Sequence, residues 1–223
     1  MSIKLFFEAI FKFLLGVLLV GLLLFVPAGT IKFLNGWLFM GLLFIPMFIA
    51  GIIMMIKSPN LLKSRLNAKE KEKEQKKIVA ISGLMFLMGF ILAGLNYRFN
   101  WLELSNIVVI ISSIVFLLSY ILYAEVLREN AFLSRTIKVE KKQKLIDTGL
   151  YGVVRHPMYL ATIFLFLSMP LILGSLISFL VFLLYPFIII KRLNNEESVL
   201  EKDLKGYKEY KKKVKYKLIP FIW

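Results

Sequence analysis

Hydrophobic residues along this chain come in long runs that polar segments separate. Each run is about as long as the roughly 17–25 residues that an α-helix needs to cross a hydrocarbon core of about 30 Å. The pattern therefore predicts membrane-spanning helices in four places. These four apolar stretches cover about residues 9–28, 34–56, 78–95 and 105–124.

A fifth apolar run, at about 157–190, is twice as long as one crossing needs. Its middle reads "SMPLILGS", in which Pro170 and Gly174 disfavour a continuous helix. A helical hairpin that crosses the membrane twice is the simplest interpretation, and a single strongly tilted helix is the alternative. The predicted fold is all-α: a polytopic transmembrane helical protein with four spans followed by a C-terminal helical hairpin.

The polar tail that begins at residue 191 carries a helical pattern of its own. Lysine and glutamate residues fill the positions between a set of larger side chains that recur near helical spacing, namely Leu200, Leu204, Tyr207 and Tyr210. This pattern predicts a cytoplasmic amphipathic helix that lies on the membrane surface. The closing "LIPFIW" is typical of an interfacial anchor.

Composition supports a membrane protein and excludes several kinds of site. Hydrophobic residues make up 59% of the 223 positions and the mean hydropathy is +0.76, more than a soluble domain of this size can bury. The chain has no cysteine, which excludes disulfides and thiolate metal ligands, and its single histidine argues against any metal site. The first apolar stretch is too long for a cleaved signal peptide, so we expect a retained span.

The charge distribution predicts how the chain is oriented. The net charge is +15, and 27 of the 29 Lys and Arg residues lie in the N-terminus, in the loops 57–77 and 125–156, and in the tail. If the spans alternate, all these segments share one side, and only Lys32 and Arg98 lie on the other. The positive-inside rule then places both termini in the cytoplasm of a multi-pass integral membrane protein. Such basic loops favour anionic membrane lipids as partners, not nucleic acid.

Candidate chemistry gathers in "GLYGVVRHPMY", where the fifth apolar run begins. His156 is the only histidine, and it lies between Arg155 and Pro157 with a tyrosine on either side. Each residue has an ordinary interpretation: proline suits the first turn of a helix, arginine can reach lipid phosphates, and tyrosines favour the membrane interface. Their gathering at a helix N-terminus favours instead a polar pocket that opens to the cytoplasm.

A second cluster, "KRLNNEE", follows the hairpin. Arg192 and Glu196 are four residues apart, which is the spacing of an ordinary helical ion pair worth about 0.2–0.5 kcal/mol, or of a site for a zwitterionic ligand. The hairpin would return Arg192 to the same leaflet as His156, so both clusters converge. No Rossmann, Walker or serine-elbow motif is present, and the scarcity of ionisable residues within the spans argues against a transporter.

The order of these motifs resembles a known enzyme family. "GLYGVVRHPMYLA" followed by "RLNNEESVL" and "GYKEYKKKVKYKLIPF" is similar to the integral-membrane methyltransferases related to isoprenylcysteine carboxyl methyltransferase, and to phospholipid methyltransferases. The resemblance covers about residues 130–222. It implies S-adenosylmethionine as the cofactor, held without a Rossmann fold, and it divides the chain into N-terminal transmembrane helices, 1–124, and a cofactor-binding catalytic region, 125–223.

The resemblance also assigns roles to residues. Arg192, Glu196 and Glu197 match the catalytic positions, and because the acidic run of the family is shortened here to "NNEE", both glutamates stay open for the amino group of the cofactor. Relatives often have histidine at the position of Gln143. The implied cofactor-binding residues are Gln143, Lys144, Leu145, Ile146, Tyr151, His156, Pro157, Met158, Tyr159 and Glu196.

The implied acceptor is lipophilic and enters sideways from the bilayer. An isoprenylcysteine-type carboxylate would need no general base, and Arg192 could orient it. A phospholipid headgroup amine must lose a proton, for which Glu196, Glu197 and His156 are candidates. A non-enzymatic membrane scaffold that binds anionic lipid is the alternative from another functional class.

Overall fold

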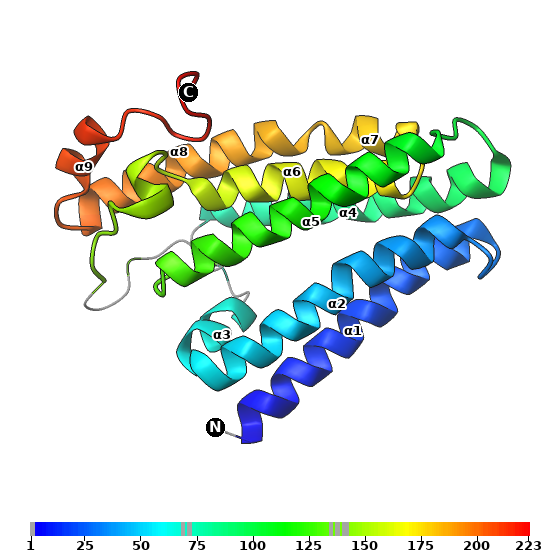
Figure 1. Ribbon diagram of the computed structural model, residues 1–223, viewed down its shortest axis with the longest axis horizontal. Helices are drawn as coiled ribbons and strands as arrows, with labels where there is room; N and C mark the ends of the chain where they lie inside the picture. The colour runs from blue at the N-terminus through cyan, green and yellow to red at the C-terminus, as the bar shows by residue number, and fades with distance from the viewer. Residues whose placement is uncertain (1–2, 68–69, 71–72, 134–135, 137–138, 140–142) are drawn as a thin grey trace.

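The protein is described here by a computed structural model that covers residues 3–67, 70, 73–133, 136, 139 and 143–223. Within these residues the structure is helical apart from one isolated bridge between Glu103 and Ser175 (Figure 1). The α-helices are α1 (Ile3–Ala28), α2 (Leu34–Lys57), α3 (Pro59–Leu66), α4 (Lys73–Phe99), α5 (Asn106–Glu129), α6 (Pro157–Ile172), α7 (Leu176–Phe182), α8 (Tyr185–Asp203) and α9 (Tyr207–Lys213), and η1 (Gly149–Gly152) is a 3-10 helix.

The predicted spans are confirmed as helices. α1, α2, α4 and α5 are each long and apolar enough to cross a membrane, and so is the stretch Leu176–Asp203 that joins α7 and α8. α6 is apolar but shorter, with 16 residues. Large apolar side chains are exposed along the outer faces of these helices, as lipid-facing surfaces require. The chain is a polytopic helical membrane protein.

The fifth apolar run forms the predicted hairpin. α6 runs in one direction along the bundle, and α7 and α8 return beside it (Figure 1). The turn lies at Gly174, whose φ of +73° is easily reached only by glycine, and the Ser175 amide donates to the Pro170 carbonyl at 3.0 Å. Pro170 itself lies inside α6 and does not end the helix. Gly174 therefore sets the turn.

The bundle has two chemically different ends. Both termini, α3, η1 and α9 lie at one end (Figure 1), and the Lys12 ammonium donates there to the Leu66 carbonyl at 2.8 Å. The short connections lie at the opposite end, where the Leu104 amide donates to the Gly174 carbonyl at 3.0 Å. The basic segments of the sequence therefore share one end, as alternating spans require. Which compartment this end faces stays a prediction.

Aromatic packing holds the hairpin against the earlier helices. Phe39, Phe90, Phe116 and Phe182 are buried in one cluster to which α2, α4, α5 and α7 contribute. α4 and α7 approach closely at Gly89, whose carbonyl accepts a hydrogen bond from the Ser178 hydroxyl at 2.8 Å. α5 packs along α6. The hairpin is thus a fixed part of the bundle, and its polar end is held in place.

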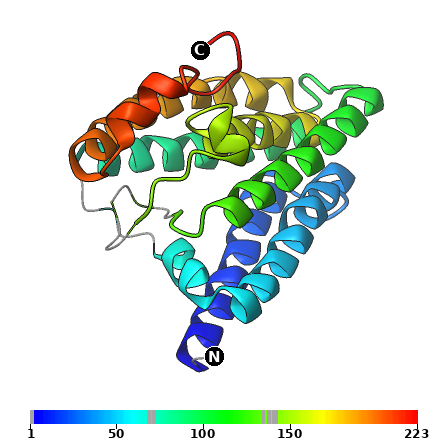
Figure 2. The same cartoon turned by 60° about the vertical axis from the view of Figure 1, so that its left-hand side comes forward.

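The amphipathic tail differs in detail from the single surface helix that the sequence predicts. α8 continues to Asp203, Gly206 adopts a φ of +86°, and α9 then folds back beside α8 (Figure 2). Tyr207 and Tyr210 are buried in a small cluster with Leu204 and Val214. Leu145, Val139 and Leu200 pack against this cluster. The apolar face of the tail is thus covered by the chain itself.

Candidate functional site

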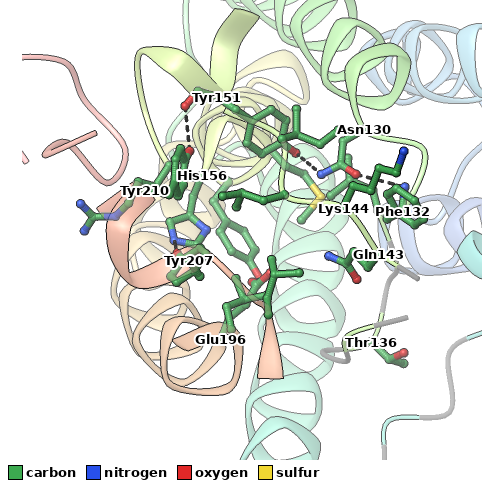
Figure 3. Close-up of a pocket in the computed structure, with 18 residues that line it drawn as sticks. Asn130, Phe132, Thr136, Gln143, Lys144, Tyr151, His156, Glu196, Tyr207 and Tyr210 are labelled. Carbon is green, nitrogen blue, oxygen red and sulfur yellow. Dashed lines mark hydrogen bonds between the residues drawn. The ribbon is translucent and has the colours of Figure 1, made fainter. Parts of the chain in front are cut away.

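A pocket opens at the basic end of the bundle, where the connector after α5, the start of α6 and the end of α8 meet (Figure 3). Nine of the ten residues that the family resemblance assigns to the cofactor line it. On one side lie His156 and Tyr207, on the other Gln143 and Lys144, and Glu196 lies between them (Figure 3). The nine residues are Gln143, Lys144, Leu145, Ile146, Tyr151, His156, Met158, Tyr159 and Glu196.

The tenth residue, Pro157, is buried behind the pocket wall. It is the first residue of α6, where proline loses no helical hydrogen bond and its restricted φ suits the helix. Its preceding residue, His156, is the N-cap and points its side chain to the pocket. Pro157 therefore contributes to the pocket indirectly, because it starts α6 directly after His156 and so fixes where the His156 side chain lies.

Arg155 anchors the tail to the start of α6. The backbone amides of Arg155 and His156 donate to the carbonyls of Tyr216 and Lys217, both at 2.9 Å. The Arg155 guanidinium donates from Nη1 to the Val214 and Lys215 carbonyls at 2.8 Å each. The Arg155 side chain is only 4% exposed. Arg155 therefore does not extend to lipid phosphates, as one sequence interpretation had it, because its donors are used within the protein.

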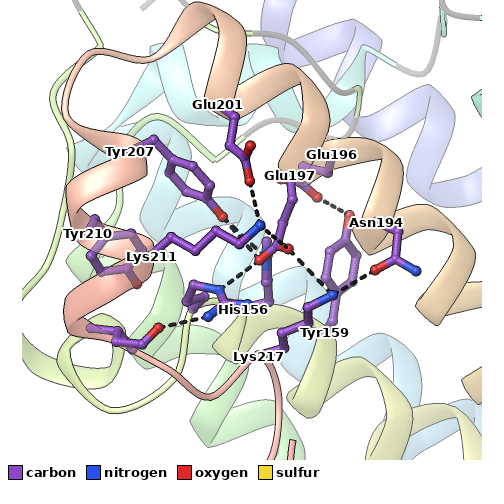
Figure 4. Close-up of polar contacts among 12 residues, drawn as sticks. His156, Tyr159, Asn194, Glu196, Glu197, Glu201, Tyr207, Tyr210, Lys211 and Lys217 are labelled. Atoms are coloured by element: carbon purple, nitrogen blue, oxygen red, sulfur yellow. Dashed lines mark hydrogen bonds and ion pairs between the residues drawn. The ribbon is translucent and has the colours of Figure 1, made fainter.

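Glu197 lies at the centre of a buried ion cluster (Figure 4). Its Oε1 accepts from Arg155 Nε at 2.7 Å and lies 3.2 Å from His156 Nε2. Its Oε2 lies 3.5 Å from the Lys217 ammonium and 3.8 Å from that of Lys211. A carboxylate that is 4% exposed needs such partners to stay ionised. The cluster joins α6, α8 and the tail into one unit.

Glu196, one residue earlier, faces the pocket instead. Its Oε2 accepts a hydrogen bond from the Tyr159 hydroxyl, and this hydroxyl in turn accepts from Arg192 Nε at 3.0 Å. Tyr159 therefore lies between the two residues whose spacing suggested an ion pair. Arg192 is not part of the pocket lining but reaches it through Tyr159. The three side chains form a polar wall next to the first turn of α6.

Three buried tyrosines add neutral hydrogen-bonding groups. The Tyr151 hydroxyl accepts from Asn130 Nδ2 at 3.1 Å, and the Tyr210 hydroxyl donates to the Tyr151 carbonyl at 2.7 Å. The Tyr207 hydroxyl lies 3.5 Å from both His156 Nε2 and Glu197 Oε1. Burial away from water raises the pKa of all three hydroxyls above the ordinary value. They are therefore protonated at neutral pH.

The segment that carries Tyr151 is held by a carboxylate. Glu129, the last residue of α5, accepts from the Leu150 amide at 3.0 and 3.1 Å, one bond to each oxygen. Gly149 has a φ of +58°, and a side chain there would collide with the Glu129 carboxylate. A carboxylate at the start of a short helix satisfies amides that lack an internal partner. Glu129 and Gly149 thus fix the position of η1 relative to α5.

Sequence reasoning did not assign half of the pocket lining. The sequence analysis named five of these residues for other reasons, namely Arg155, Leu200, Leu204, Tyr207 and Tyr210. The connector residues gave no signal, because a segment without hydrophobic periodicity does not indicate what it contacts. The lining residues that carried no cofactor assignment are Asn130, Phe132, Leu133, Thr136, Arg155, Leu200, Leu204, Tyr207 and Tyr210.

Fold and site together define a class: a multi-helix membrane protein whose polar pocket is built by a helical hairpin and its tail. The comparison with known families identifies it further. Residues 106–206 match the phospholipid methyltransferase family. The matched segment begins with α5 and ends after α8, so it contains the connector and the hairpin. The family resemblance of the sequence is confirmed over this segment.

One curated relative is similar over a shorter region. The chain is 31% identical over 91 residues to the Delta(14)-sterol reductase TM7SF2 of Mus musculus. The aligned part is 40% of this chain but 22% of the reductase, so the chain spans about a fifth of the length of that protein.

Proposed function

We propose that the protein is an S-adenosylmethionine-dependent methyltransferase that acts on a lipophilic acceptor. The observation that carries the proposal is the pocket itself, because it gathers nine of the ten residues assigned to the cofactor from four separate segments. The match to phospholipid methyltransferases over the same part of the chain also supports the proposal.

The chemistry of the lining fits the cofactor. S-adenosylmethionine combines an amino acid group, a sulfonium and an adenosine, and when bound it supplies a methyl group that is already activated for transfer. The Glu196 carboxylate can accept from an ammonium group, and the Asn130 and Gln143 amides offer donors and acceptors for a nucleoside. Leu145 and Leu200 supply apolar surface. The donor set therefore suits a ligand that is partly zwitterionic and partly apolar.

The two glutamates have different roles in this proposal. Glu196 faces the pocket and binds the amino group of the cofactor. Glu197 is used by Arg155, His156 and the tail lysines, so we assign it to holding the pocket together and not to binding the cofactor. Of the two glutamates that the sequence left open for the amino group of the cofactor, we therefore propose Glu196.

The acceptor side of the pocket centres on Arg192 and Tyr159. Arg192 holds the Tyr159 hydroxyl, which in turn contacts Glu196. A carboxylate acceptor could be oriented by Arg192 and needs no base. An amine acceptor must release a proton, and Glu196 and His156 are the pocket-lining groups able to take it. The family match supports the phospholipid headgroup amine over an isoprenylcysteine-type carboxylate.

The membrane location proposed for the site follows from charge. The basic end of the bundle is assigned to the cytoplasm by the positive-inside rule, so the cofactor enters from the cytoplasm and the acceptor from the adjoining leaflet. The rest of the reaction depends on positioning and on exclusion of water, since a sulfonium methyl needs no further activation.

The test is calorimetric binding of S-adenosylhomocysteine to detergent-purified protein. Wild type should bind, and Glu196→Gln should weaken binding about tenfold or more, because a hydrogen bond to a charged group is lost. Glu209→Gln is the matched control, since Glu209 is exposed on α9 outside the pocket. Folded wild type that binds no S-adenosylhomocysteine would instead indicate the non-enzymatic membrane scaffold.

A further inference from the structure

The tail that follows α9 is bonded to the pocket through its backbone. After α9 the chain turns back beside the first turn of α6 (Figures 1 and 2), where the Tyr216 and Lys217 carbonyls accept the backbone amides of Arg155 and His156, both at 2.9 Å. Arg155 and His156 both line the pocket. Any contact that fixes this part of the tail therefore also fixes two lining residues.

A tight turn further along the tail presents apolar side chains outward. The amides of Leu218 and Ile219 both donate to the Trp223 backbone oxygen at 2.9 Å, and the Trp223 amide donates to the Ile219 carbonyl at 3.1 Å. Phe221 and Ile222 in this turn are 87% and 77% exposed. Phe221 adopts a φ of +66°, which a bulky residue avoids unless its surroundings hold it there. The turn thus holds two large apolar side chains in outward positions.

The same turn packs on the tail residues that are bonded to the pocket. The Phe221 and Tyr216 ring centroids lie 5.4 Å apart, and the Tyr216 carbonyl accepts one of the two backbone bonds described above. The Lys217 ammonium lies 5.1 Å from the centre of the Trp223 ring and 3.5 Å from Glu197 Oε2. The outward-facing turn and the pocket wall are therefore joined by direct contacts.

The length of α6 places this part of the tail at the membrane surface. α6 has 16 residues, so its axis spans about 24 Å, which is less than the roughly 30 Å of a hydrocarbon core. The first turn of α6 therefore lies at or inside the headgroup boundary, and so does the tail segment that is bonded to it. Phenylalanine and isoleucine side chains exposed at this depth are suited to the boundary between headgroups and acyl chains.

Exposed lysines precede the turn. Lys208 and Lys212 lie on α9 and Lys215 follows it, and all three residues are exposed. Glu209 is the acidic residue within α9. This excess of cations favours an anionic partner, and lysines near an anionic leaflet bind it electrostatically. Apolar insertion together with basic residues gives the two signals that stable binding to a membrane surface requires.

We propose that the tail binds anionic lipid of the adjoining leaflet and that this contact tightens the cofactor pocket. An anionic surface shifts the pocket through its greater affinity for the tail that is docked against α6. A pocket wall that is already held in place costs less to order when the cofactor binds. The inference rests on the methyltransferase function proposed above, and it places a regulatory surface outside residues 106–206. The surface consists of Lys208, Lys212, Lys215, Phe221 and Ile222.

The test measures the affinity of the full chain for S-adenosylhomocysteine in lipid nanodiscs of two compositions. One contains dioleoyl phosphatidylcholine alone, and the other contains equal parts of dioleoyl phosphatidylcholine and dioleoyl phosphatidylglycerol. Neither headgroup has a primary amine or a carboxylate, so a difference between them is not acceptor binding. S-adenosylhomocysteine has no net charge at neutral pH, so an anionic surface does not concentrate it. Wild type should bind at least about fivefold more tightly in the anionic nanodiscs, and high salt should reduce this gain.

Replacing the three tail lysines together should remove the gain. A chain with Lys208→Gln, Lys212→Gln and Lys215→Gln should bind S-adenosylhomocysteine equally in both nanodiscs, with the affinity of wild type in the neutral one. Phe221→Ser tests the apolar half of the surface separately and should reduce the gain.

The matched control also replaces three exposed lysines, but outside the tail. Lys57 ends α2, Lys63 lies on α3 and Lys76 lies in the first turn of α4, so all three belong to the basic end of the bundle. A chain in which these three are replaced by glutamine loses the same charge as the tail variant. It should keep the gain in anionic nanodiscs.

The outcomes separate this inference from the proposed function. Equal affinity of wild type in the two nanodiscs, with S-adenosylhomocysteine bound in both, would overturn the regulatory role of the tail alone. A gain that persists in the tail variant, or that the control variant also loses, would assign the effect to the basic end as a whole and not to the tail. Absence of binding in both nanodiscs would overturn the methyltransferase and this regulation with it. If soluble heparin produces the same gain in neutral nanodiscs, the tail binds a polyanionic macromolecule and the lipid assignment is wrong.

Discussion

Glu196 and Glu197 are adjacent in the sequence, yet the helix turns them to different surroundings. Glu196 contacts Tyr159 in the pocket wall, whereas Glu197 is enclosed by Arg155, His156 and two lysines. Neighbouring helical positions point about 100° apart, and here Glu196 lines the pocket whereas Glu197 does not. Substitutions at these two positions should therefore affect different properties.

Glu197→Gln should destabilise the fold. The substitution leaves Arg155 and its neighbours buried without a counter-charge, and breaking a buried ion pair in this way costs about 3–5 kcal/mol. For a chain of this size the unfolding midpoint should fall by about 6–20 °C in a thermal melt. Glu196→Gln, at a partly exposed carboxylate, is the control and should melt near wild type. Equal midpoints for all three proteins would contradict the structural role of Glu197.

The buried tyrosines predict a loss of stability in alkali. Burial raises the pKa of Tyr151, Tyr207 and Tyr210 above the ordinary value of 10.0. Above that pH the unfolded chain ionises these hydroxyls while the folded chain keeps them neutral, so the free energy of unfolding decreases as pH rises. Below it they contribute no pH dependence. Denaturant unfolding at a series of pH values should show a smaller alkaline decline for Tyr207→Phe; a decline identical to wild type would count against this account.

Among the secondary-structure elements, η1 depends most on one glycine. Gly149→Ala would push a methyl group into the Glu129 carboxylate at a positive φ, so Glu129 should lose its bonds to the Leu150 amide. We expect displacement of Tyr151 and at least about tenfold weaker S-adenosylhomocysteine binding. Calorimetry would measure it.

The matched control for that change is Gly83→Ala, because a methyl group at position 83 meets no atom within 4 Å. Alanine there should be neutral or stabilising, since it favours the helix by about 0.5–1 kcal/mol. Binding that is retained in Gly149→Ala, or lost equally in Gly83→Ala, would show that η1 is not held by Glu129 in the way the contacts indicate.

The overall topology predicts the sidedness of two lysines. Lys32 and Lys208 are both exposed, and the α1–α2 connection and α9, which carry them, lie at opposite ends of the bundle (Figure 1). The absence of native cysteine permits single labels. With the protein expressed in the cell membrane of bacterial spheroplasts, a membrane-impermeant maleimide should label Lys32→Cys, and it should label Lys208→Cys only after permeabilisation, because basic segments stay in the cytoplasm. The reverse labelling pattern would place the pocket outside the cell.

The helical spans and the hairpin could be predicted from the sequence because they depend on local properties. A run of apolar residues must form a helix to satisfy its backbone in lipid, whatever lies next to it. The nine cofactor-assigned residues that line the pocket were named from the family resemblance. The order of motifs can be compared between two sequences even where the three-dimensional arrangement cannot be calculated from either. The assignment of 1–124 and 125–223 to separate roles stays a prediction.

What the tertiary structure decided is which distant groups meet. Arg155 joins the tail carbonyls, Glu129 holds η1, and Arg65 reaches α6 from α3. These contacts span from about twenty to more than ninety residues of chain, and no local pattern signals them, because they depend on how the helices pack. The sequence by itself determined the membrane class, the spans and the motif. One helical step points the side chains of Glu196 and Glu197 in different directions, and the packing of α8 in the bundle decided that Glu196 faces the pocket and Glu197 the buried ion cluster.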